Sequence, residues 1–387
     1  LWITRNVVVS NCVVAGCRAE GDGGGILLSS GGLVTHCDVL GNVAGGAGGG
    51  IKITATGEVV RCRIADNVAS NGGGGIHAYT TNSVDSIRIG HCRIENNRAP
   101  GIENGGGVYL WHGRIHDSLL VSNSAYAGGG LYGNVAAVEH CTVADNVATN
   151  GGGLYVSGCE VRNAVVWGNA RSNLFRSGSG NVVEHCVVAP ATAGEGNLAA
   201  DPLFRDPAAG DYRLKYSSPA LDAAADSDLL LDLDGRLRPL DGTFDGAAAP
   251  DVGAFEYDPE TADSNGDGIP DRWYHAYALD PNDAAIAAEH SDADGFDNRS
   301  EWIALTDPTN ADSHFSIQFA SNAPVRLVGF DSRTNRLYLL QRCTQLTENA
   351  WSDSPDEPER PGNGGTDSFG VPDAPTAAAF RIRVRLP

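Results

Sequence analysis

The sequence is short of three things: methionine, aromatic residues and positive charge. It has no methionine, 7% aromatic residues, and 27 Lys and Arg against 48 Asp and Glu, a formal net charge of −21. This balance argues against a nucleic-acid partner, because phosphate backbones are bound mainly through Lys and Arg. No stretch approaches the roughly 18 apolar residues that a membrane-crossing helix requires, so we expect no membrane span in this chain.

Glycine, in contrast, is abundant, with 50 residues, and its runs recur about every 25 residues. These runs begin at Gly23, Gly48, Gly72, Gly105, Gly128 and Gly151. Two further series keep the same phase. One comprises Cys12, Cys37, Cys62, Cys92, Ser118, Cys141, Ala164 and Cys186, and the other comprises Cys17, Asn42, Asn67, Asn97, Asn123, Asn146 and Asn169. Three series in phase indicate a structural repeat.

Each repeat has the pattern of short strands. Residues 33–42 (LVTHCDVLGN) alternate apolar and polar, which predicts one half-buried strand with Leu33 and Val39 inward and His36 outward. A second alternating stretch follows each glycine run. Short strands without a helical period predict an all-β fold, a right-handed parallel β-helix of about eight coils over residues 1–199. Successive coils would lie about 4.8 Å apart.

The beginning of the sequence carries its own expectation. The chain lacks a starting methionine and an apolar leader, so we expect a mature or trimmed product whose signal peptide is not in this chain. The alternating pattern is already in progress at Leu1, which leads us to expect further coils upstream.

The repeated Asn, Gly and Cys residues are best explained as scaffold. Identical Asn side chains on stacked coils can form a hydrogen-bonded ladder, and glycine allows close backbone approach that a Cβ forbids. Cys37, Cys62 and Cys92 occupy an inward position, where cysteine acts as a small apolar residue. We therefore expect a stack of buried free thiols. The states of three other cysteines stay open: Cys17, Cys159 and Cys343.

Residues 200–257 no longer follow the repeat. Four segments carry a resemblance: 201–204 (DPLF), 210–214 (GDYRL), 218–222 (SPALD) and 251–256 (DVGAFE). They resemble the choice-of-anchor Q domain of β-helical surface proteins, although Ala224 stands where that family usually has glycine. The glycine repeats are similar to those of polymorphic outer membrane proteins, with GGGI in place of GGAI. These resemblances imply a secreted or cell-surface bacterial protein, in which residues 200–257 would cap the open end of the coils.

Two acidic loops within residues 258–313 have the spacing of calcium ligands. The first loop, 263–274, offers Asp263, Asn265, Asp267 and Asp271, and the second, 290–301, offers Asp292, Asp294, Asn298 and Glu301. Oxygen ligands at alternate positions before a glycine suit a hard cation. Tyr274 ends the first loop where an EF-hand has Glu, and His290 begins the second. The segment is similar to thrombospondin type 3 or dockerin-like repeats, so we expect structural Ca²⁺ in a spacer; a solvated acidic linker is the alternative.

The last segment, 314–387, predicts a small β-sandwich. Its expected strands are 315–319 (FSIQF), 325–330 (VRLVGF), 336–343 (RLYLLQRC) and 380–387 (FRIRVRLP), with a loop over 352–375. The segment resembles the C-terminal modules that follow calcium linkers in secreted bacterial proteins.

An enzyme of the β-helix class would need a recognisable site. A polygalacturonase-type hydrolase would require an Asp cluster with GHG and RIK motifs, and neither string occurs. The position before the cysteine series is expected to face outward: Asn11, His36, Arg61, His91, Asp117, His140, Asn163 and His185. Its histidines lie on alternate coils, about 9.6 Å apart, too far to share a zinc ion with ligands near 2 Å. We therefore predict no catalytic residue.

The strand after the glycines offers a better candidate. Its first outward column is Leu27, Lys52, His77, Tyr109, Tyr132 and Tyr155, and its second is Ser29, Thr54, Tyr79, Trp111, Asn134 and Ser157. Exposed aromatic clusters mark interaction sites, and aromatic faces suit the apolar faces of sugars. The predicted glycan-binding residues are therefore Tyr79, Tyr109, Trp111, Tyr132 and Tyr155. Alternatively, cross-strand packing favours aromatics here, or another element covers them.

These features together predict a secreted or surface-displayed binding or adhesion protein whose ligand is a polysaccharide or surface glycan. A polysaccharide lyase or glycoside hydrolase of the pectate-lyase-like class is the alternative, and a passive stalk is the third interpretation. Carboxylates beside an arginine in a groove would favour the enzyme. A bare aromatic ribbon would favour the binding protein, and a ribbon covered by loops would favour the stalk.

Overall fold

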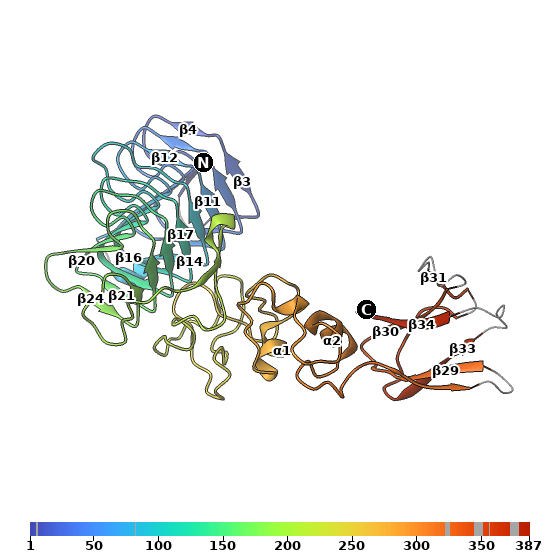
Figure 1. The fold of residues 1–387 in the computed structure, drawn as a ribbon. Helices are drawn as coiled ribbons and strands as arrows, with labels where there is room; N and C mark the ends of the chain where they lie inside the picture. Colours follow the sequence, from blue (N-terminus) through green and yellow to red (C-terminus); the bar gives the residue numbers. More distant parts are fainter. Residues whose placement is uncertain (5–6, 82, 322–325, 344–350, 356, 372–378) are drawn as a thin grey trace. The chain divides into compact units, whose positions relative to one another are not determined.

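The computed structural model describes residues 1–4, 7–81, 83–321, 326–343, 351–355, 357–371 and 379–387. Its contacts divide the chain into two compact units, Leu1–Ala262 and Asp263–Pro387. The first unit contains a right-handed parallel β-helix of about seven turns (Figure 1). The predicted fold class is confirmed. Each main stack holds eight strands, one from each predicted coil.

The coils place their strands in three main parallel stacks. The first stack consists of β1 (Trp2–Ile3), β5 (Ile26–Leu28), β9 (Ile51–Thr54), β13 (Ile76–Tyr79), β16 (Val108–His116), β18 (Leu131–Glu139), β20 (Leu154–Ser157) and β23 (Leu174–Ser177). The second consists of β2 (Val8–Ser10), β6 (Leu33–Thr35), β10 (Gly57–Val60), β14 (Ile87–Gly90), the second halves of β16 and β18, β21 (Glu160–Arg162) and β24 (Val182–Glu184).

The third stack completes each turn. It consists of β3 (Val13–Ala15), β7 (Asp38–Leu40), β11 (Arg63–Ala65), β15 (Arg93–Glu95), β17 (Leu119–Val121), β19 (Thr142–Ala144), β22 (Val165–Trp167) and β25 (Val187–Val188). Three short strands form a further sheet: β4 (Arg18–Ala19), β8 (Val43–Ala44) and β12 (Val68–Ala69). A 3-10 turn, η1 (Val84–Ser86), precedes β14.

The core of the coils is built from like residues in register. Ile26, Ile51 and Ile76 pair across β5, β9 and β13, and all three are fully buried. Burying each such side chain contributes about 1.5–3 kcal/mol. One unbroken hydrophobic core therefore runs along the coils.

The single strand predicted over residues 33–42 is in fact two strands, β6 and β7, separated by a turn at His36. His36 has a φ of 51°, in the left-handed region. The turn shifts the alternation by one residue, so that Val34 and Val39 are buried while Leu33 is only half-buried. The prediction that Leu33 points inward is wrong, because the sequence alternation runs through a turn at which the backbone changes direction.

The asparagine ladder is confirmed. Nδ2 of Asn67 donates to Oδ1 of Asn97 at 2.9 Å, and Nδ2 of Asn97 donates to Oδ1 of Asn123 at 3.0 Å. Each Oδ1 also accepts the backbone N–H of the Asn one coil earlier. The same pattern continues through Asn146 and Asn169. The ladder thereby provides hydrogen-bond partners for buried backbone N–H groups and side-chain amides along the stack of coils.

The glycine runs fit against this ladder. Gly128 has a φ of 63°, and a Cβ added to Gly129 would lie 2.4 Å from the carbonyl oxygen of Gly152. A Cβ on Gly130 would lie 3.0 Å from Nδ2 of Asn146. Only glycine therefore fits this turn, where neighbouring coils approach backbone to backbone. All nine cysteines are free, and seven of them, including Cys159 and Cys343, are buried, whereas Cys12 and Cys17 are exposed.

Residues 200–257 pack along the side of the coils, over the third stack. Val165 and Val187 contact Leu221 and Val252, and Leu119 belongs to a second cluster with residues of the same segment. The segment contains β26 (Phe204–Asp206), η2 (Pro207–Ala209) and β27 (Asp211–Leu214). It covers a flank of the coils, where the sequence had predicted a cap on their open end. The residues before the cysteine series were predicted to face outward; we call them the turn column, because each has a left-handed φ. Three of them are consequently buried: Asp117, His140 and Asn163.

The second unit contains short helices and two antiparallel sheets. Its helical segments are α1 (Asp271–Ala276), η3 (Ile286–Ala288) and α2 (Asn298–Ala304). One sheet holds β28 (Ile317–Ser321), β29 (Arg326–Asp331) and β33 (Thr366–Val371), and the other holds β30 (Leu337–Cys343), β31 (Trp351–Asp353), β32 (Arg360–Pro361) and β34 (Ala379–Arg385). Phe330 and Phe369 of the first sheet share a core with Tyr338 and Leu340 of the second.

The loop predicted over residues 352–375 is wrong in part. It contains β32 and β33, and β33 pairs with β29 along its whole length. Its sequence, TDSFGV, lacks the apolar alternation that identifies a strand, so this pairing depends on the neighbouring strand. Val325, Asp356 and residues 372–375, which also belonged to the predicted strands and loop, lie outside the described residues.

Candidate functional site

The predicted tyrosines meet in one continuous aromatic column on the first stack. The column comprises His77, Tyr109, Tyr132, Tyr155 and Phe175, one residue from each of β13, β16, β18, β20 and β23. Its neighbouring ring centroids lie 4.3, 5.2, 4.7 and 5.1 Å apart, with interplanar angles between 9° and 17°. Parallel in-register pairing therefore stacks the rings face to face.

Face-to-face stacking determines what the aromatic column can offer a ligand. Each inner ring is covered on both faces by its neighbours, so its edge and hydroxyl point outward. The hydroxyls of Tyr109, Tyr132 and Tyr155 make no hydrogen bond with any residue in the described part of the chain. Burial raises the pKa of Tyr109 to about 12, which keeps its hydroxyl protonated. The column thus presents a row of free hydroxyl groups that can both donate and accept.

Phe175 at the end of the column was not among the predicted residues. Its side chain is 40% exposed. The column predicted from the sequence ends at Tyr155, because no glycine run marks the following coil. The register of LFRS (174–177) with LYVS (154–157) is the signal that could have located it.

The second aromatic pair lies on the same strands, two residues further on. The rings of Tyr79 and Trp111 are 5.9 Å apart and tilted by 44°. Tyr79 is 42% exposed, so this pair, unlike the stacked tyrosines, leaves ring surface accessible. All five predicted ligand-binding residues therefore lie on one face of the coils.

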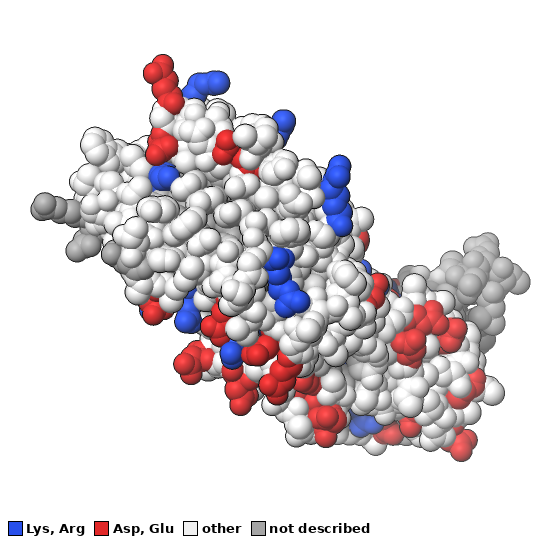
Figure 2. All heavy atoms as spheres, turned by 90° about the vertical axis from the view of Figure 1, so that its left-hand side faces the viewer, with Lys and Arg blue, Asp and Glu red and all other residues white. Residues whose placement is uncertain are grey.

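A buried lysine continues the aromatic column beyond His77. Nζ of Lys52 lies 2.9 Å from Nδ1 of His77 and 3.9 Å from a carboxylate oxygen of Asp22. Burial, reinforced by the lysine charge, lowers the pKa of His77 to about 3. His77 is therefore a neutral acceptor for the lysine. The side of the coils seen in Figure 2 carries few charged side chains.

A groove of about 370 Å³ opens on the second stack and was not predicted. It is lined in part by Arg114, Glu139, Glu160 and Arg162. Glu139 accepts a hydrogen bond from Ser227 and lies 3.7 Å from Arg114, while Arg162 pairs with Glu160 and with Glu184 on the next strand. The glutamates of this groove are thus already engaged by cationic or hydroxyl donors.

The second acidic loop brings three of its predicted ligands together. Asp292, Asp294 and Glu301 each place one oxygen within 4.8 Å of the other two. One oxygen of each is buried without a hydrogen-bond partner, and Glu301 is only 1% exposed. Burial and the Asp292 charge raise the pKa of Glu301 to about 7. Three carboxylates that each keep one buried oxygen without a donor form a site that suits a hard cation.

The first acidic loop places its polar residues at the same positions of the loop sequence as the second, but it ends in Tyr274 and not in a glutamate. The Tyr274 hydroxyl donates to Oδ2 of Asp267 at 2.7 Å, and Asn265 donates to the same oxygen. Asp263 accepts the backbone N–H groups of Gly266 and Gly268. Donors within the protein thus engage the carboxylate oxygens of the first loop, whereas one oxygen of each carboxylate in the second loop has no donor.

The ninth residue of each loop serves another role. Asp271 accepts hydrogen bonds from the backbone and hydroxyl of Ser264, and Oδ1 of Asn298 accepts from the Ser291 hydroxyl. Asn298 also donates to the Ile286 carbonyl. The structure therefore brings Asp271 and Asn298 to the loop serines and leaves the carboxylate cluster to the other residues.

Comparison with known proteins bears on the coils alone. Residues 1–116 match the family model described as the right handed beta helix region, which agrees with the stacked parallel strands. No curated protein matches the chain. In the described part of the chain, no helix has the length and apolar character needed to cross a membrane.

Proposed function

We propose that this protein is a secreted or surface-displayed adhesion protein that binds a polysaccharide along the aromatic column. The observation that carries the proposal is the uninterrupted stack from His77 to Phe175, with tyrosine hydroxyls free of partners among the described residues. A polysaccharide offers a matching row of hydroxyl groups. The exposed rings of Tyr79 and Trp111 provide apolar contact beside that row.

Rigidity supports binding at this surface. Tyrosine supplies a large amphipathic contact area at low entropic cost, and stacking between coils further restricts each ring. A ligand that binds along the column therefore orders little of the protein, which reduces the cost of association.

The groove on the second stack contains glutamates, as a glycosidase site does, but their surroundings support an enzyme less than their presence suggests. A glycosidase needs two carboxyl groups, one of which must donate a proton. Glu139, Glu160 and Glu184 each lie beside an arginine with which they form an ion pair. We interpret the groove as an ion-pair network and keep a lyase or hydrolase as the second candidate.

Calcium completes the proposed function as a structural ion. Asp292, Asp294 and Glu301 would hold Ca²⁺ in the second loop, where their unpartnered oxygens converge. In the first loop, the Tyr274–Asp267 hydrogen bond supplies the stabilisation that an ion would otherwise give. One ion per chain is therefore proposed, with the role of stiffening the spacer.

Affinity electrophoresis through gels that contain neutral or acidic polysaccharides, with calcium present, tests the binding function. Retardation by an intact polymer is expected. Tyr132→Ala should abolish it by interrupting the stack, and Tyr132→Phe should weaken binding about fivefold by removing one hydroxyl worth roughly 1 kcal/mol. Tyr126→Ala is the matched control, because Tyr126 is 42% exposed but lies outside the column.

The outcomes separate the candidate functions. Undiminished retardation of a folded Tyr132→Ala variant would sink the proposed binding surface. A cleared zone in the gel would instead show that the chain degrades the polymer. Glu160→Gln would then be the first variant to assay, since this residue lines the groove.

A further inference from the structure

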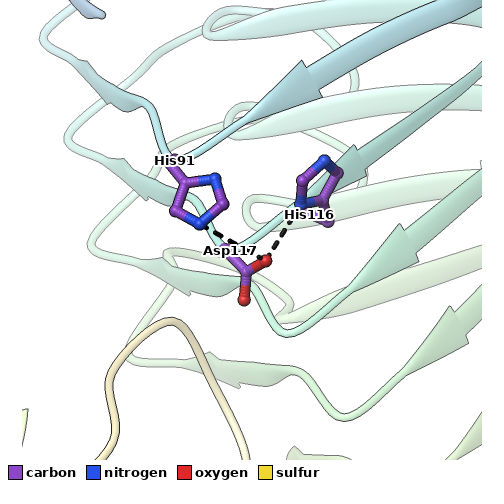
Figure 3. A group of neighbouring side chains, drawn as sticks. All are labelled: His91, His116 and Asp117. Atoms are coloured by element: carbon purple, nitrogen blue, oxygen red, sulfur yellow. Dashed lines mark hydrogen bonds and ion pairs between the residues drawn. The ribbon is translucent and has the colours of Figure 1, made fainter. Parts of the chain in front are cut away.

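Two histidines and an aspartate from adjacent coils converge beneath the segment that covers the turn column. His116 is the last residue of β16, and its strand partner is Gly90, so His91 and Asp117 follow in the same register one coil apart. Oδ2 of Asp117 lies 2.9 Å from Nδ1 of His116 and 3.9 Å from Nε2 of His91 (Figure 3). All three residues offer ligand atoms within 4.8 Å of one another.

The two oxygens of Asp117 face different partners. Oδ2 faces both imidazoles, whereas Oδ1 lies 3.5 Å from Nη1 of Arg238. Arg238 is buried and donates through Nη2 to the Gly253 carbonyl, which fixes its position. The guanidinium thus faces Oδ1 of the Asp117 carboxylate, and Oδ2 is left to face the two histidines.

The hydrogen bonding of this cluster is incomplete. Asp117 is fully buried, and neither its Oδ1 nor Nε2 of His91 has a hydrogen-bond partner. Nε2 of His91 faces Oδ2 of Asp117 at 3.9 Å, a separation too long for a direct hydrogen bond. Ligand atoms of three residues therefore converge in one place while Nε2 of His91 has no hydrogen-bond partner, which is an arrangement that a metal ion would complete.

We propose that His91, His116 and Asp117 form a Zn²⁺ site. Two ligands bound at about 2.0–2.2 Å in a tetrahedral site lie roughly 3.3 Å apart, and the observed 2.9 and 3.9 Å bracket this value. Binding through Nδ1 of His116 would require its proton to reside on Nε2, because the ligating nitrogen must be deprotonated. Arg238 would hold the non-ligating oxygen of Asp117, as outer-shell donors do at metal sites.

The site has three protein ligands and so leaves a fourth position for water or an exogenous donor. His91 also lines a pocket of about 410 Å³ together with Arg61, Arg63 and Arg93. These arginines favour an anionic donor at the open position, such as a carboxylate. This proposal does not depend on glycan binding at the aromatic column, which lies on a different stack.

The test is metal binding by tag-free protein saturated with calcium, which keeps the acidic loop occupied. Cys12 and Cys17, the two exposed thiols, are replaced by serine in every variant so that they cannot bind zinc. Equilibrium dialysis with Zn²⁺ should give one bound ion per chain. Co²⁺ as a probe should give the visible absorption of a tetrahedral nitrogen and oxygen site without a thiolate charge-transfer band.

Two ligand variants and one control make the result decisive. Loss of an outer-shell partner costs roughly 10–100-fold in affinity, so His116→Ala should cost at least that factor for Zn²⁺. His36→Ala should retain full affinity, because His36 occupies the turn column two coils away and is exposed. Asp117→Asn tests the carboxylate if it folds, and His116→Ala suffices if it does not.

Three results would overturn the site: no bound Zn²⁺, equal affinity of folded His116→Ala and wild type, or a thiolate band with Co²⁺. Thermal unfolding followed by circular dichroism establishes that each variant is folded before its affinity is compared.

Discussion

At the residue scale, backbone conformation explains why histidine recurs in the turn column. The turn column has left-handed φ at each position, for example 54° at Asn11, 51° at His36 and 45° at His140. Asn, Asp and His adopt this region more readily than other residues with a Cβ. Most members of the column therefore meet a conformational requirement. His91 and Asp117 also lie beside His116, with which they form the proposed zinc site.

The asparagine ladder leads to a prediction about stability. Asn97→Ala removes the amide that bonds Asn67 and Asn123 and that donates to the Ile64 carbonyl. Each buried group left without a partner costs about 1–3 kcal/mol, so we expect a loss of at least roughly 3 kcal/mol in the free energy of unfolding of the first unit. Urea denaturation measures it, and the exposed Asn71→Ala is the control. A loss equal to that of the control would contradict the role of the ladder.

The glycine runs lead to a second prediction. Gly129→Ala would place a Cβ 2.4 Å from the Gly152 oxygen, and the neighbouring backbone cannot yield without disturbing the stack. We expect destabilisation of about 1–3 kcal/mol by overpacking. Gly21→Ala is the matched control, since nothing lies within 4 Å of its added Cβ. A melting temperature for Gly129→Ala equal to that of Gly21→Ala would exclude the packing argument.

At the element scale, the two acidic loops reveal how one residue alters a turn. Both loops use a serine at the second position to bond the residue at the ninth. They differ at the twelfth position, where Tyr274 donates to Asp267 and Glu301 adds another carboxylate. This exchange of a donor for an acceptor at the twelfth position is the reason that the proposed calcium ion is assigned to the second loop alone.

The Glu301 carboxyl makes the second unit sensitive to pH when calcium is absent. Its folded pKa of about 7 exceeds the ordinary value of 4.5, so the folded state holds more protons between these values. Stability should therefore fall as pH rises from about 4.5 to about 7, and added calcium should restore it. Chemical denaturation at several pH values checks this, and Glu301→Gln should remove both the pH dependence and the calcium response. A metal-free unit whose stability rises through this window would refute the assignment.

At the scale of the whole molecule, the chain consists of two compact units with separate cores. The first unit is stabilised by an uninterrupted apolar core and a buried ladder, and the carboxylate cluster of the second acidic loop belongs to neither. The second is smaller, and its helical segments surround a small core beside the carboxylate cluster. An ion in the second loop should therefore matter to the second unit only.

Chelation tests this division. Addition of EDTA to calcium-loaded, zinc-free protein should increase protease cleavage within residues 258–313 and lower the unfolding temperature of the second unit. The transition of the first unit should stay unchanged. Limited proteolysis with mass spectrometry locates the cuts, and Glu301→Gln without EDTA should reproduce the pattern. Simultaneous unfolding of both units on chelation would contradict the proposed role of calcium.

The sequence by itself determined the repeat, the fold class, the ladder and the aromatic column, because identical residues at one phase must stack when coils repeat. It could not determine which outward positions remain exposed, since residues 200–257 fold back over the third stack from outside the repeat. It also could not place His116 beside His91, because a left-handed turn lies between the strand and the turn column. Tertiary structure decided these points by bringing together groups whose distance depends on the path of the chain.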